Sequence, residues 1–226
     1  MYFTLLFCVL GMALLVAIAV ILLSRLLSHE SWRSRGKGAY GEETVASLLQ
    51  SLPKEYHIFN DIYILVDGRS IQIDHVVISV YGIFVIETKN YGGWIFGSDR
   101  YEKWIENFYG QKYYFYNPVK QNYTHLKALQ KVLRIPIDKF VSVVVFLERA
   151  ELKCNTKGNV IYSSELNDFI KGYNQAIMTP SHVDNAINTL SNALVADEGI
   201  KKAHAKNAQE RVKRYEDYRD TISSSY

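Results

Sequence analysis

The sequence predicts a chain of the α/β class, in which helices flank a mixed central sheet and one transmembrane helix precedes the domain. Residues 1–24 form one apolar run without a charged side chain. After this run, segments with helical and strand-like patterns alternate, which is typical of a layered α/β domain. Of the 226 residues, roughly 190 follow the apolar run and the linker after it, which is enough to enclose a full hydrophobic core.

The apolar run has the length of a membrane anchor, because about 20 helical residues cross the hydrocarbon core of a bilayer. A cleaved signal peptide is the alternative, but it needs a basic start and a shorter apolar stretch, and this run has neither. Residues 25–37 follow as a basic juxtamembrane linker. Positive charge on this side favours a single-pass protein of the cell membrane whose C-terminal domain is cytoplasmic.

The first predicted helix spans residues 40–52, where apolar residues recur at helical spacing along one face, and Pro53 ends it. Strands are predicted next at residues 56–66, 70–80 and 83–88. The dipeptide Asp67-Gly68 separates the first two strands, and such a pair between apolar runs is a strong hairpin signal.

Short strands at residues 94–96 and 101–105 are predicted to form a further hairpin, and the aromatic segment 113–116 fits either a strand or a loop. Residues 140–146 are almost wholly apolar and β-branched, which is typical of a strand buried on both faces. A last strand is predicted at residues 159–162.

Asn117 and Pro118 are typical of a helix start, as N-cap and first helical residue. They predict a helix that ends near Leu133 and turns Leu126 and Leu129 inward. Further helices are predicted at residues 164–171, 180–196 and 203–220. The expected organisation is an anchor at 1–24, a linker at 25–37, a domain core at 38–150 and a C-terminal strand and helical extension at 151–226.

Charge is distributed unevenly along the chain. Residues 38–88 hold 2 basic and 7 acidic side chains, whereas residues 89–134 hold 8 basic and 3 acidic ones. This order suits a metal site beside a phosphate-binding surface, although ordinary solvated faces give the same pattern. The 2 cysteines, Cys8 and Cys154, do not suggest a disulfide framework.

Two acidic residues interrupt apolar strands. Asp74 follows Ile73 in the second strand, and Glu87 follows an apolar run in the third. A buried acid is costly unless it is paired or bound to a metal. Lys89 shares a face with Glu87 because side chains alternate along a strand. We therefore expect Asp74, Glu87 and Lys89 to converge on one surface of the sheet, and His75 to face away as a structural residue.

Two further polar residues border the same region. Glu42 points along the apolar stripe of the first helix, and Gln121 lies in the first turn of the helix that starts at Asn117. Glu42 is alternatively a first-turn acid that favours the helix dipole, and Gln121 is alternatively an ordinary helix residue.

Four motifs together resemble the nuclease-related domain (NERD) family. They are Gly38-x-x-Gly41-Glu42, Ile73-Asp74-His75-Val76-Val77-Ile78, Gly82-Ile83-Phe84-Val85-Ile86-Glu87-Thr88-Lys89-Asn90 and Asn117-Pro118-x-x-Gln121. That family is similar to the restriction-endonuclease-like superfamily with its PD-(D/E)xK signature, and in this chain Ile73 stands where the signature has proline.

The resemblance implies a restriction-endonuclease-like fold and a metal-dependent nuclease acting on nucleic acid, with DNA as the expected substrate. Asp74 and Glu87 would then hold Mg²⁺, or Mn²⁺, through oxygen ligands, and Glu42 would complete the metal shell. Lys89 would orient or help deprotonate the attacking water, and Gln121 would position the water or a phosphate.

Two other interpretations remain open: a non-cleaving nucleic-acid- or protein-binding module on a nuclease fold at the membrane, and an assembly protein. The aromatic residues Trp94, Trp104 and 113–116, interspersed with Arg100, Lys103 and Lys112, suit base stacking and phosphate contact. Packing within a sheet is the alternative role for these aromatics. The sequence leaves the oligomeric state open.

Overall fold

The computed structural model describes residues 37–195. The predicted transmembrane helix at 1–24, most of the linker and the charged helix at 203–220 lie outside these residues. Within the described part, no helix is both long and apolar enough to cross a bilayer.

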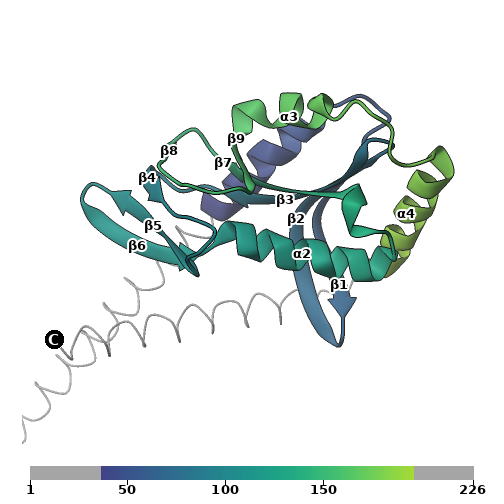
Figure 1. The fold of residues 1–226 in the computed structure, drawn as a ribbon, viewed down its shortest axis with the longest axis horizontal. Helices are drawn as coiled ribbons and strands as arrows, with labels where there is room; N and C mark the ends of the chain where they lie inside the picture. The colour runs from purple at the N-terminus through teal and green to yellow at the C-terminus, as the bar shows by residue number, and fades with distance from the viewer. Residues whose placement is uncertain (1–36, 196–226) are drawn as a thin grey trace, which may run out of the picture.

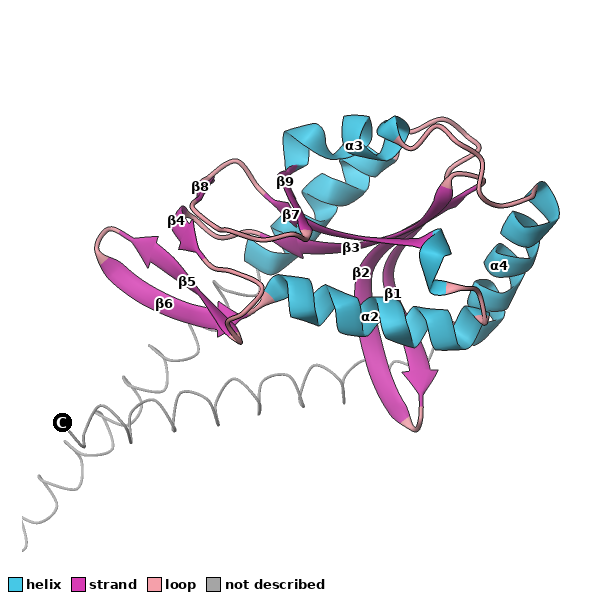
Figure 2. Ribbon diagram, in the orientation of Figure 1, coloured by secondary structure: helices cyan, strands magenta, loops and turns pink. Residues whose placement is uncertain are grey.

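A mixed five-stranded sheet forms the centre of the fold (Figures 1 and 2). Its order is β1-β2-β3-β7-β9. β1, β2 and β3 are antiparallel neighbours, while β7 runs parallel to β3 and β9 parallel to β7. The strands are β1 (His57–Val66), β2 (Arg69–Ser79), β3 (Gly82–Lys89), β7 (Phe140–Phe146) and β9 (Asn159–Tyr162). The mixed central sheet is therefore confirmed.

The β1-β2 hairpin turns where the dipeptide signal predicted it. Asp67 and Gly68 have φ angles of 51° and 73°, so both turn residues are left-handed. This is the conformation of a two-residue type I′ turn, whose twist matches that of the flanking strands.

Helices cover both faces of the sheet, as Figure 2 shows. α2 (Pro118–Leu133) and α4 (Pro180–Ala193) pack on one face, in a cluster that includes Leu129, Leu190 and Ile83. The helix over residues 37–49 and α3 (Leu166–Gly172) pack on the other face. Short 3₁₀ turns, Ile137–Lys139 and Ser163–Glu165, precede β7 and α3.

A second, four-stranded sheet lies at one end of the molecule, at the left of Figure 1. Its order is β6-β5-β4-β8, with β4 (Gly93–Phe96), β5 (Lys103–Phe108), β6 (Gln111–Tyr116) and β8 (Ala150–Leu152). The predicted hairpin thus belongs to a sheet of its own. The aromatic segment 113–116 is its strand β6, and the three-residue strand β8 has no pattern long enough to predict.

Trp104 joins the second sheet to the first. It is fully buried, and its ring stacks on Phe146 of β7 with centroids 6.3 Å apart. The base-stacking role considered for Trp104 is therefore wrong, because the side chain fills the core between the two sheets.

Candidate functional site

The predicted acids lie where β2 separates from β3. The antiparallel pairing runs from Ser79 and Gly82 to His75 and Ile86. Asp74 and Glu87 are the next residues on each strand, whereas β3 continues to pair with β7 as far as Lys89. The Asp74 Oδ2 atom accepts a hydrogen bond of 2.8 Å from the backbone N–H of Thr88. This contact holds the carboxylate at the fork between the strands.

The alternation of side chains breaks at the same level of the sheet. Ile73 and Val76 both belong to the α2-side cluster although three positions separate them. In β1, Asp61 has a φ of 47° and lies between the paired residues Asn60 and Ile62. A local irregularity of this kind re-aims a side chain, and such features are frequent beside active sites. Asp61 stands opposite Asp74 in this register, so both acids lie at the irregular level of the sheet.

Glu87, Lys89 and Gln121 form one hydrogen-bonded group. The Lys89 Nζ atom lies 2.6 Å from Glu87 Oε1 and donates to Gln121 Oε1 at 3.2 Å. The amide of Gln121 in turn donates to Glu87 Oε1 at 2.7 Å. On the other carboxylate oxygen, His125 Nδ1 lies 3.2 Å from Glu87 Oε2. The three predicted residues therefore meet, and His125 joins them.

His125 was missed by the sequence analysis. It lies four residues after Gln121, so both side chains lie on the same face of α2. That spacing was a usable signal, but it carries weight only once Gln121 is known to face Glu87.

α2 is fixed in place at its start, which determines where Gln121 points. Asn117 accepts hydrogen bonds from the backbone N–H groups of Val119 and Lys120, as the predicted N-cap. Asn122 is fully buried, and its side-chain nitrogen donates to the carbonyl oxygens of Val85 and Val143 at 2.8 and 3.0 Å. These bonds connect α2 to both β3 and β7, beside Gln121.

Glu42 approaches the site from the helix over residues 37–49. A Cβ atom built on Gly41 would lie 2.9 Å from the Cβ of Asn90, so glycine permits the helix to pack against the end of β3. The Asn90 side chain also donates to the carbonyl oxygen of Lys37 at 2.7 Å. Burial, Asp61 and Glu87 raise the pKa of the Glu42 carboxyl, and Lys89 opposes them.

The charges of the three acids Glu42, Asp74 and Glu87 are coupled. Burial and the charges of Glu87 and Glu42 raise the pKa of Asp74 well above its usual value. Burial also opposes ionisation of Glu87, but Lys89 and His125 outweigh it and lower the pKa of Glu87 to about 2. Glu87 is therefore ionised at neutral pH, while the charge on Asp74 is disfavoured in the metal-free protein.

Lys89 carries its charge in this site, as expected from its neighbours. Its side chain is 15% exposed. Burial works against the ammonium form, yet Glu87, Tyr91 and Asp74 raise the pKa of Lys89 above its ordinary value. Lys89 is thus a hydrogen-bond donor and not a base in the metal-free protein.

Asp61 and Tyr63 were also missed. Burial and the neighbouring Asp61 and Glu42 raise the pKa of Tyr63 to about 12, and its hydroxyl is hydrogen-bonded to Asp61. No sequence pattern marks Asp61, because its role depends on the irregularity in β1. Of the predicted residues, Glu87, Lys89 and Gln121 are in direct contact. Asp74 and Glu42 interact with Glu87 and Lys89 electrostatically, without a hydrogen bond between their side chains.

The donor set suits a hard divalent cation with few protein ligands. Among the described residues, no three His, Cys, Asp or Glu side chains are grouped tightly enough to hold a metal ion. Mg²⁺ is commonly held by one or two carboxylates together with water and substrate phosphates. Asp74 and Glu87 meet that requirement, and their mutual repulsion is of the kind that a cation relieves.

Two comparisons relate the chain to known proteins. The nuclease-related domain family matches residues 37–147, which run from the helix that carries Glu42 to the end of β7. An uncharacterised protein of Bacillus anthracis is 32% identical over 200 residues, which cover 85% of this chain and 92% of that protein. The chain belongs to the nuclease-related domain family.

Proposed function

We propose that this protein is a membrane-anchored nuclease that hydrolyses phosphodiester bonds of DNA with the help of Mg²⁺. The observation that supports it most is the contact between Glu87, Lys89 and Gln121 next to Asp74 at the fork of β2 and β3. Two carboxylates with a charged lysine beside them are the groups that metal-assisted phosphodiester hydrolysis uses.

In this proposal Asp74 and Glu87 hold Mg²⁺, or Mn²⁺, and Glu42 adds negative charge beside them. The bound cation would supply a water of lowered pKa and neutralise charge on the scissile phosphate. The Lys89 ammonium donates to the attacking water or to a phosphate oxygen. Gln121 holds both Glu87 and Lys89, so it keeps the carboxylate and the ammonium group in a fixed relative position.

The test is cleavage of plasmid and linear DNA by the full-length chain in detergent. Cleavage should require Mg²⁺ or Mn²⁺ and stop with EDTA. Asp74→Ala and Lys89→Ala should each lower the rate by at least about 100-fold, the usual cost of losing a group that acts in the transition state. Lys54→Ala, which removes an exposed lysine, is the control and should cut like the parent. Parental rates in both site variants would refute the proposal.

A non-cleaving binding module remains the second candidate, and one observation favours it. The Lys89 Nζ atom lies 2.6 Å from Glu87 Oε1, so the two side chains form an ion pair without a metal. This candidate predicts DNA binding that weakens with salt and no cleavage with any divalent cation.

A further inference from the structure

The second sheet has an outer face that no described helix or strand covers. Its strands alternate, so residues facing the core and residues facing solvent are distinct sets. Ile95, Trp104 and Phe115 face inward, next to Phe146. The outward set is aromatic and well exposed: Trp94 is 49%, Phe96 38%, Tyr114 51% and Tyr116 48% exposed.

The outward aromatics share one face of the sheet, with other side chains of β5 between those of β4 and β6. Phe96 pairs with Ile105, and Ile105 pairs with Tyr114. Tyr116 pairs with Lys103 in the adjoining row. Side chains of directly paired residues lie about 5 Å apart. Ile105 therefore lies between the rings of Phe96 and Tyr114, and Lys103 lies beside Tyr116 on the same face.

Trp94 is held in a fixed orientation at the edge of this surface. Its indole N–H donates to Glu151 of β8 at 2.7 Å, and Lys153 pairs with the same carboxylate. The ring also meets Phe96 edge-on, with centroids 6.3 Å apart. An exposed ring that is already ordered loses little freedom when a ligand stacks on it.

A groove of about 1270 Å³ continues the surface. Phe96, Ile105 and Tyr114 line it, and four basic residues surround them: Arg100, Lys103, Lys153 and Lys157. The acidic residues at the groove are Asp99 and Glu102. Asp99 is engaged by the hydroxyl of Thr156 and by the backbone N–H of Lys157. Lys153 is also paired with Glu151 at the edge of the groove. The four cations outnumber the acids Asp99, Glu102 and Glu151, so the groove keeps a net positive charge beside the stacking surface.

We infer that this face binds single-stranded nucleic acid, with bases stacked on Trp94, Phe96 and Tyr114 and phosphates against the lysines and Arg100. Exposed aromatics in a basic groove are the features that bind single strands, because every unpaired base offers a flat face. A duplex keeps its bases stacked on each other and cannot use the rings. A single strand therefore fits both the rings and the charge.

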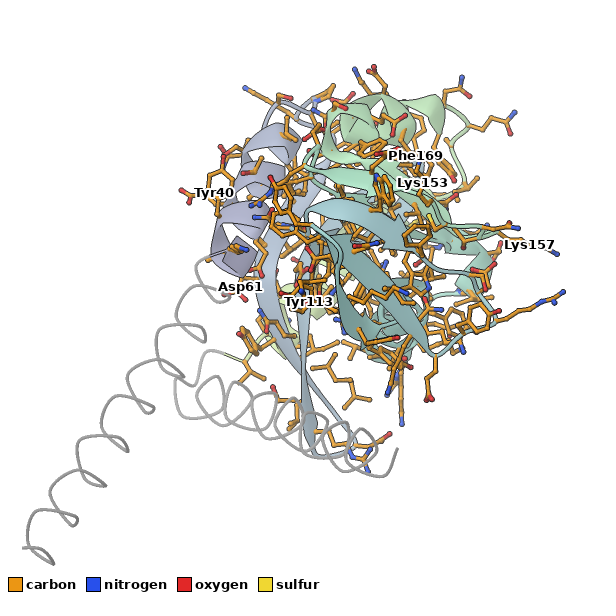
Figure 3. All side chains as sticks on the ribbon, turned by 90° about the vertical axis from the view of Figure 1, so that its left-hand side faces the viewer. Tyr40, Asp61, Tyr113, Lys153, Lys157 and Phe169 are labelled. Carbon is orange, nitrogen blue, oxygen red and sulfur yellow. The ribbon has the colours of Figure 1, made fainter. Side chains whose placement is uncertain are left out.

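The second sheet follows the candidate site directly along the chain, and its inner face contacts the segment after Lys89. Tyr91 stacks on Phe115 of β6 with centroids 4.3 Å apart, and it follows Lys89 by two positions. The chain from Lys89 to Trp94 spans at most about 18 Å. Figure 3 views the molecule from this end, with Asp61 and Tyr113 labelled toward the lower left and Lys153 and Lys157 to their right. As a substrate preference, the inference rests on the proposed nuclease function, whereas binding itself does not.

The experiment measures binding of labelled oligonucleotides to the full-length chain in detergent, with EDTA present so that no cleavage occurs. The probes are oligothymidine and oligouridine of about 15 nucleotides, in the range of known single-strand sites, and a blunt duplex of the same length. The parent should bind the single strands more tightly than the duplex.

Trp94→Ala and Tyr114→Ala should each weaken single-strand binding by about fivefold or more, the effect of losing one stacked base. Trp94→Phe and Tyr114→Phe keep a ring and should stay near the parental affinity. Tyr123→Ala removes a tyrosine of similar exposure on α2 and is the matched control. Parental affinity in both alanine variants, or equal losses for the duplex, would overturn the inference.

Self-association, followed by sedimentation of the same variants, tests another occupant of the face. If the alanine variants dissociate an oligomer and leave oligonucleotide affinity unchanged, the face joins copies of this chain and the inference is wrong. Lys89→Ala separates the two proposals: it should abolish cleavage and leave single-strand binding intact. Binding without cleavage in the parent would refute the nuclease alone.

Discussion

At the residue scale, Asp74 carries a conflict between stability and the proposed chemistry. Its pKa is raised by burial and by Glu87 and Glu42, and none of these influences acts on the unfolded chain. The metal-free folded state therefore disfavours the charge that a cation would need. The rest of the fold offsets this cost in free energy, as is usual for an active site that trades stability for activity.

Asp74→Asn should abolish cleavage and yet raise the free energy of unfolding, by about 1 kcal/mol, at neutral pH in EDTA. The neutral amide can still accept the Thr88 N–H, but it no longer repels Glu87. The gain should shrink as the pH falls, because Asp74 in the parent is then protonated in the folded state. Denaturant unfolding measures it, with the exposed Asp184→Asn as control. A loss of stability at neutral pH would contradict the argument.

His75 makes the folding stability depend on pH with a sign opposite to that of Asp74. It is 1% exposed, its Nδ1 lies 2.8 Å from Asn60 Oδ1, and burial lowers its pKa to about 4. Since the unfolded chain takes up a proton near pH 6.5 and the folded protein does not, stability is present above that pH and lost as the pH falls toward 4. This lowering of the His75 pKa corresponds to about 3 kcal/mol of folding stability.

His75→Gln should remove this dependence. The parent and the variant are compared by urea unfolding at about pH 7 and pH 4.5. The variant should lose less stability than the parent over this interval, whatever its absolute stability is. Parallel pH profiles would show that His75 is not the group that titrates.

At the element scale, the helix over residues 37–49 reaches the site through one close contact. Gly41 is buried against Asn90 and Thr88, whereas a Cβ on Gly38 would meet only Glu42 Oε1, at 4.0 Å. Two glycines three residues apart therefore have different roles. Gly41 allows the packing that brings in Glu42, and Gly38 has room for a side chain.

Gly41→Ala should displace the helix from β3 and lower the free energy of unfolding by about 1–2 kcal/mol, as overpacking does. Since a displacement of about 1 Å is costly for catalysis, cleavage should fall at least about tenfold. Gly38→Ala is the matched control and should be neutral or slightly stabilising, because alanine favours a helix. Equal effects in the two variants would contradict the contact as its cause.

At the scale of the whole molecule, the family match ends at residue 147 but the core does not. β9 completes the sheet, and Ile170 of α3 and Leu190 of α4 are buried in its two clusters. After α4, the Val195 N–H donates to the carbonyl oxygen of Tyr63 at 2.8 Å. The described part of the C-terminal extension is therefore integral to the domain.

The anchor predicted at residues 1–24 gives a further prediction for the whole chain. Expressed in bacteria, the full chain should stay with membranes after an alkaline wash, because an apolar helix of about 20 residues inserts stably. A chain that lacks residues 2–24 should move to the supernatant. If both forms are released, the run is not an anchor.

The sequence by itself determined most of the elements, though not β8 or β6, and the residue types of the site. Periodicity and local signals gave the strands, the Asp67-Gly68 turn and the Asn117 cap, because these depend on neighbours along the chain. It also singled out Glu87, Lys89 and Gln121, which the structure brings into contact. An acid within an apolar strand is conspicuous whatever the fold.

Only the tertiary structure decided how distant segments meet. The second sheet depends on pairing of β4 with β8, more than 50 residues away in the chain, and no local pattern encodes that. The same holds for Asp61, which the irregular strand β1 places near Asp74, and for the burial of Trp104 beside an exposed Trp94. Local propensities act over a few residues, whereas burial and charge coupling arise between segments that the fold alone makes neighbours.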